Sequence, residues 1–64
     1  MRKKTNSEII AYAIGTEVDA VHLYHFILRR VKGDAAKTIA HILKEEIDHL
    51  TELFNLLSKE RMDA

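Results

Sequence analysis

Apolar side chains recur along this chain with a period that predicts two long α-helices. From Ile10 to Val31 the steps between apolar seam positions alternate between four and three residues, and residues 35–56 repeat the alternation. A mean spacing of 3.5 residues is typical of helices that pack side chains as knobs into holes. The pattern therefore predicts an all-α fold.

Each predicted helix has one seam, and the second seam is wide. The first seam consists of Ile10, Ile14, Glu17, Val21, Tyr24, Leu28 and Val31. The second consists of Ala35, Ile39, Ile42, Glu46, His49, Leu53 and Leu56, and it is widened by Leu43, Leu50, Phe54 and Leu57. A widened stripe favours a bundle of more than two helices, because a lone hairpin leaves part of it in water.

Local signals mark where the helices start and where they are joined. Thr5 with Glu8 predicts a capping box, with Asn6 as the alternative N-cap. Gly33 suits a left-handed cap at the end of the first helix, and Asp34 suits the N-cap of the second. We expect a single domain over residues 1–64, with a helix at about 6–32, a turn at 33–34 and a helix at about 35–60. So short a turn predicts an antiparallel hairpin.

Composition limits what so small a domain can be. With 64 residues and no cysteine, the chain lacks disulfides, thiolate metal sites and cysteine catalysis. Chains of this size often need a metal or an oligomer to be stable. Tyr12, Leu23 and Phe26 form a second apolar strip on the first helix, which indicates a further interface.

Charge and hydropathy narrow the expected partners and compartment. The formal net charge is zero, so we expect no nucleic acid partner. The pair Arg29-Arg30 is interpreted as a cation cluster that favours a helix C-terminus. No apolar run approaches 18 residues and no signal peptide is recognised, so we expect a cytoplasmic protein without membrane contact.

Three metal-capable side chains, Glu17, Glu46 and His49, occupy seam positions that normally hold apolar residues. Counted from the junction of Gly33 and Asp34, they lie 16.5, 12.5 and 15.5 positions away. In an antiparallel hairpin they therefore share one level, within about 6 Å of axial height. A buried carboxylate is costly unless it is paired. The alignment predicts a metal site, the alternative being a polar layer that fixes helix register.

A Glu on one helix with Glu-x-x-His on the next matches half of a dinuclear carboxylate site, so we expect a second copy of the chain to supply the other half. A dimer would form a four-helix bundle with two copies of each ligand. The negative charges of four carboxylates then balance the positive charges of two divalent ions. Oxygen and imidazole ligands without sulfur favour iron or manganese, with zinc possible. We favour Glu46 as the bridging ligand and Glu17 as a terminal ligand.

Residues 13–57 resemble the ferritin-like superfamily of di-iron carboxylate proteins. Glu17 in the segment 14–17 and the Glu46/His49 pair in the segment 45–49 carry the resemblance, which is closest to encapsulated ferritins and rubrerythrin-like two-helix proteins. It implies a ferritin-like four-helix bundle built by a homodimer, with a decameric ring and an encapsulin shell, a protein nanocompartment, as possible further assemblies. Tyr24 matches a tyrosine near the metals. Thr16 stands where that family has a second glutamate.

The resemblance implies a ferroxidase that oxidises Fe(II) to Fe(III) for iron storage or detoxification. Glu17, Glu46, His49 and Tyr24 are the expected catalytic residues, and two iron ions per dimer are the expected cofactor. One alternative is a rubrerythrin-like protein that reduces peroxide at a di-metal site. The other is a non-catalytic helical interaction module, stabilised by a metal or by a polar layer.

Overall fold

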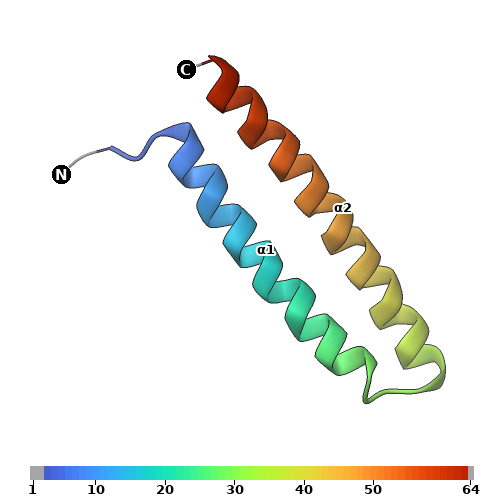
Figure 1. Cartoon of the computed structure of the whole chain (residues 1–64). Coiled ribbons are helices and arrows are strands. Elements are labelled where there is room, and N and C mark those ends of the chain that lie inside the picture. Colours follow the sequence, from blue (N-terminus) through green and yellow to red (C-terminus); the bar gives the residue numbers. More distant parts are fainter. Residues whose placement is uncertain (1–2, 64) are drawn as a thin grey trace.

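The computed structural model of the chain is an antiparallel hairpin of two α-helices, described here for residues 3–63 (Figure 1). Helix α1 spans Asn6–Leu28 and helix α2 spans Gly33–Asp63. The two helices lie side by side, and the start of α1 and the end of α2 are at the same end of the hairpin. This agrees with the predicted helical hairpin. No helix in the described range is both long and apolar enough to cross a membrane.

The start of α1 is fixed by the capping box that the sequence predicts. The hydroxyl of Thr5 accepts a hydrogen bond from the Glu8 backbone N–H at 3.2 Å. In return, the Thr5 backbone N–H donates to Oε1 of Glu8 at 3.2 Å. Thr5, not Asn6, is therefore the N-cap. Both bonds satisfy backbone N–H groups that have no partner within the helix.

Helix α1 ends four residues before the expected position at about residue 32. Arg29 is its C-cap, and the Arg30 N–H bonds to the Ile27 carbonyl at 2.9 Å. The connection to α2 is therefore residues 29–32, two residues longer than the expected turn and within the range of about 2–5 residues found in helical hairpins.

The first residue of α2 has a left-handed backbone conformation. Gly33 has φ 65°, the conformation expected of it, although it begins α2 and does not cap α1. Asp34 lies in the first turn of α2, where its negative charge complements the helix dipole. At the other end, α2 continues to Asp63, beyond the expected residue 60. After Gly33 the chain has neither glycine nor proline to stop a helix.

The contact between the helices uses the predicted seam of α1 but a shifted face of α2. All seven residues of the first predicted seam are buried or half-buried, six of them in α1 and Val31 in the connection, and Ile10 is among the most buried side chains. On α2, Leu43 and Leu57 are 8% exposed, whereas Leu56 is 45% exposed. The expectation that Leu56 belongs to the contact seam was therefore wrong for the single hairpin. Leu43 and Leu57, which were expected only to widen the apolar stripe, are the residues that pack against α1.

A hairpin one helix thick leaves much apolar surface uncovered. Its shortest extent is 11 Å, about the diameter of one helix, so no layer of residues covers its broad faces. Large apolar side chains remain exposed on both helices: Ile9, Tyr12, Leu23, Phe26, Ile47, Phe54, Leu56 and Met62. Tyr12, Leu23 and Phe26 are among them, so the second apolar strip of α1 lies outside the contact with α2.

Candidate metal centre

The α1 seam carries Glu17 into the contact between the helices. The residues one turn before and after it on the seam, Ile14 and Val21, are half-buried. They hold this face of α1 against α2, so the Glu17 side chain is only 27% exposed. Its Oε2 atom is buried and has no hydrogen-bond partner. A buried carboxylate oxygen without a partner costs free energy unless a cation or proton satisfies it.

Helix α2 supplies the other two side chains from one turn. Glu46 and His49 are three residues apart, a spacing that places both on one side of a helix. Glu46 lies on the contact face and is half-buried. His49 lies at the edge of that face and is 52% exposed at its side chain. The turn therefore points one ligand inward and another toward the uncovered side of the hairpin.

The structure brings all three predicted ligands together at one level. One candidate ligand atom from each of Glu17, Glu46 and His49 lies within 4.8 Å of the others. Across the contact between the helices, Nδ1 of His49 lies 4.0 Å from Oε2 of Glu17. That distance is too long for a hydrogen bond. The antiparallel register thus produces the common level that was counted from the turn.

The carboxyl groups of Glu17 and Glu46 are close enough to change the pKa of Glu46. The pKa of Glu46 is raised above its ordinary value of 4.5, first by a hydrogen bond with the Glu17 carboxyl and then by desolvation. The negative charge of Glu17 raises it further, while His49 acts in the opposite direction. Two carboxyl groups this close favour sharing a proton. A divalent cation would replace that proton and satisfy both groups.

The donor set fits a hard or borderline divalent metal. Two carboxylates and one imidazole are ligands that iron, manganese and zinc accept. Three side chains leave coordination positions open, which water, a substrate or a further protein ligand can fill. The half-exposed imidazole of His49 marks the side on which the site is open.

Tyr24 and Glu45 are not part of the cluster of Glu17, Glu46 and His49. Tyr24 is half-buried on the same seam, about two helical turns from Glu17. Within residues 3–63 no hydrogen bond joins its hydroxyl to Glu46. Glu45, the neighbour of Glu46 in the chain, is exposed, and its Oε1 lies 2.7 Å from Nε2 of His41.

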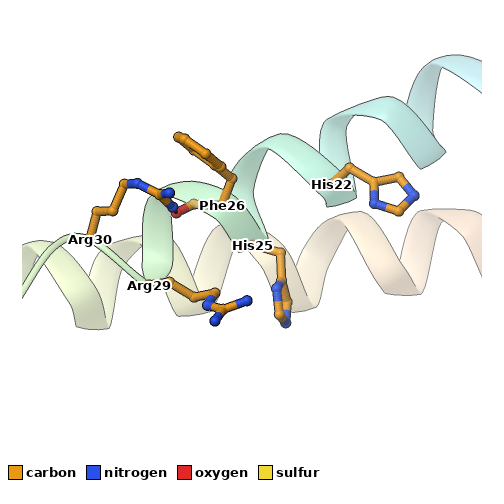
Figure 2. A pocket seen from close by; sticks show the side chains of 5 residues that line it. All are labelled: His22, His25, Phe26, Arg29 and Arg30. Atoms are coloured by element: carbon orange, nitrogen blue, oxygen red, sulfur yellow. The ribbon is translucent and has the colours of Figure 1, made fainter.

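A second group of polar residues was not predicted as a site. A surface hollow near the end of α1 is lined by His22, His25, Phe26, Arg29 and Arg30 (Figure 2). The sequence shows these residues at intervals of three, four and seven. That spacing was the available signal, because it places side chains on one helix surface.

No family model, curated protein or solved structure matches this chain. The resemblance to ferritin-like proteins therefore stays a hypothesis that rests on the three clustered side chains and their register.

Proposed function

We propose that two copies of this chain form a four-helix bundle that holds two metal ions between Glu17, Glu46 and His49 of each copy. The proposed activity is oxidation of Fe(II) to Fe(III) for iron storage or detoxification. The observation that carries the proposal is the cluster itself. Three metal-capable side chains converge within 4.8 Å, and one of their oxygens is buried without a partner.

The position of His49 supports a second copy as the source of the missing ligands. Ile42, His49 and Leu56 follow one another at seven-residue intervals along one edge of the α2 contact face. A partner that covers His49 would therefore also cover Leu56, which is 45% exposed in the hairpin. Burial of such apolar surface favours association by about 25 cal/mol per Å². A two-fold pairing through this edge places the two ligand sets next to each other.

Charge balance favours two ions per dimer. Four carboxylates from two copies carry about four negative charges, and two divalent ions carry four positive ones. The resulting bundle centre is close to neutral, which removes most of the penalty of burying ionised groups. With only one ion or none, protons must supply the missing positive charge. The raised pKa of Glu46 is consistent with this need for protons or metal.

In the proposed reaction, iron is the reductant and dioxygen the oxidant. Two Fe(II) ions give up one electron each, and dioxygen accepts both together with two protons from water to become hydrogen peroxide. The metals supply the redox chemistry. The role of Glu17 and Glu46 is to hold the ions with oxygen ligands that stabilise the higher charge of Fe(III). His49 would supply the imidazole ligand at the edge that the second copy covers.

The test compares iron oxidation by the unaltered chain with that by two single variants. Anaerobic protein is loaded with Fe(II), exposed to air, and followed by Fe(III) absorbance and dioxygen consumption. We expect oxidation well above the buffer rate in the unaltered chain and loss of that excess in Glu46→Gln. Glu52→Gln is the matched control, because Glu52 is an exposed glutamate one turn beyond His49 on the same helix. Equal rates in all three proteins would refute the ferroxidase proposal.

Two further readouts separate the alternatives. Faster consumption of hydrogen peroxide than of dioxygen would assign the site to peroxide reduction. Stoichiometric metal binding without oxidation in either assay would assign it to a structural role in a helical interaction module. Elemental analysis of the purified oligomer identifies the metal, and we expect about two ions per dimer.

A further inference from the structure

The last two turns of α1 carry a hollow whose lining is cationic and polar. It has a volume of about 560 Å³ and is lined by His22, His25, Phe26, Arg29 and Arg30. None of these five residues is acidic. Figure 2 shows His25 and Arg29 extending to one side of the helix, and Phe26 and Arg30 to the other. The hollow shares no residue with the group of Glu17, Glu46 and His49.

Arg30 is held in place at the rim of this hollow. Its guanidinium carbon lies 3.5 Å from the centre of the Phe26 ring. Its Nη1 atom donates a hydrogen bond to the Phe26 carbonyl at 2.9 Å. Stacking and the hydrogen bond fix the plane of the guanidinium, which has five N–H donors and uses one here. The remaining donors are thus preorganised, which lowers the entropy cost of binding an acceptor.

The other cation-capable groups repeat at helical spacing beside Arg30. His22, His25 and Arg29 lie at intervals of three and four residues, which places them along one surface of α1. Guanidinium groups match the oxygens of a phosphate with paired hydrogen bonds, and an imidazole adds an N–H donor. The volume lies within the range of about 300–1,000 Å³ found for small-molecule pockets.

Stabilisation of the helix end explains only part of this arrangement. Cations near a helix C-terminus interact favourably with its dipole, but the effect is confined to about the last turn. His22 lies nearly two turns before Leu28, where α1 ends. A dipole effect also requires neither a hollow nor a guanidinium fixed against an aromatic ring.

We infer that the hollow lined by His22, His25, Phe26, Arg29 and Arg30 binds a small oxyanion of the phosphate class. The arginine side chains supply paired N–H donors, and the two imidazoles supply single donors. Inorganic phosphate and pyrophosphate are the simplest ligands with this chemistry. The inference is independent of the proposed iron oxidation, since either site can exist without the other.

The test measures binding of phosphate and pyrophosphate to the full chain in its purified oligomeric state, by calorimetry at low ionic strength. We expect saturable binding and roughly tenfold weaker affinity in Arg29→Gln, the loss typical of one charge-assisted hydrogen bond. Arg61→Gln is the matched control, because Arg61 is an exposed arginine in the last turn of α2. We expect it to leave the affinity unchanged.

Two comparisons guard against other sources of binding. In Glu46→Gln the affinity should be retained, which excludes phosphate bound through metal at the other site. A single-stranded oligonucleotide tests for a polymeric phosphate ligand. Non-saturable binding, equal weakening in the Arg29 and Arg61 variants, or binding of the oligonucleotide without pyrophosphate would each overturn the inference.

Discussion

The Nδ1 atom of His49 lies 4.0 Å from the Oε2 atom of Glu17, across the contact between α2 and α1. Oxygen and nitrogen ligands bind divalent transition metals at about 2.0–2.2 Å, so two ligand atoms on one ion lie at most about 4.3 Å apart. The separation is thus too long for a hydrogen bond but compatible with a shared cation. Oε2 of Glu17 is also the buried oxygen without a partner, which makes this gap the centre of the candidate site.

Metal binding at this gap should stabilise the folded chain. With free Fe(II), Mn(II) or Zn(II) at about 100 times the dissociation constant, linkage adds roughly 2.7 kcal/mol to the free energy of unfolding. Thermal unfolding followed by circular dichroism, with metal and then with a chelator, measures this gain. Glu17→Gln should abolish most of it, and Glu52→Gln should retain it. A metal response that is the same in both variants would mean that the ion binds elsewhere.

The pH dependence of the metal-free chain follows from the raised pKa of Glu46. A carboxyl group with a higher pKa in the folded than in the unfolded state stabilises the fold while it is protonated. That contribution is complete below the ordinary value of 4.5 and is lost as pH rises through the raised pKa of the folded state. The metal-free chain should therefore lose stability over this range.

Thermal unfolding of the metal-free chain between pH 4 and pH 8 tests the origin of this dependence. Glu46→Gln should reduce the change of thermal stability with pH, because the amide that replaces the Glu46 carboxyl group does not titrate. Glu52→Gln should preserve it. A curve that is unchanged by Glu46→Gln would place the titration on another group and would contradict the shared proton between Glu17 and Glu46.

The features that sequence could predict are those set by local or periodic chemistry. The capping box depends on Thr5 and Glu8 alone, so its residues were identified correctly. The common level of Glu17, Glu46 and His49 follows from counting outward from one turn, and the four-residue connection shifts it little. In both cases the feature follows from how many residues separate the side chains in the sequence.

The features that sequence missed depend on contacts between the helices. The apolar period continues to Val31, which is half-buried in the connection, so periodicity does not mark the end of α1 at Leu28. The apolar stripe of α2 is wide enough for either Leu56 or Leu57 to face α1, and only packing selects Leu57. The cationic hollow was overlooked because exposed arginine and histidine on an outer face resemble ordinary solvated residues.

The difference between Leu57 and Leu56 can be measured directly. Leu57 is 8% exposed and Leu56 45% exposed in the hairpin. Leu57→Ala should cost at least about 2 kcal/mol of unfolding free energy, the lower end for buried leucine truncation. Denaturant unfolding measures this at any chain concentration. If Leu57→Ala costs less than Leu56→Ala at the lowest concentrations, where dimers dissociate, the assignment of the contact face is wrong.

The proposed dimer makes Leu56 important in a different way. A charge at this position should leave the hairpin contact intact but disrupt the edge that also carries His49. We expect Leu56→Glu to convert the 7.4 kDa chain from a dimer or larger assembly to a monomer, as measured by light scattering. Helix content by circular dichroism will fall if the isolated hairpin is marginal, so the two quantities are measured on the same sample.

The control for that experiment is Met62→Glu, which adds the same charge at a side chain that is 85% exposed and near the end of α2. It should leave the assembly unchanged. If the metal site takes ligands from both copies, as proposed, Leu56→Glu should also reduce metal binding, although it alters no ligand. Retention of about one ion per chain in a monomeric Leu56→Glu protein would show that a single hairpin suffices, and the shared site between copies would have to be abandoned.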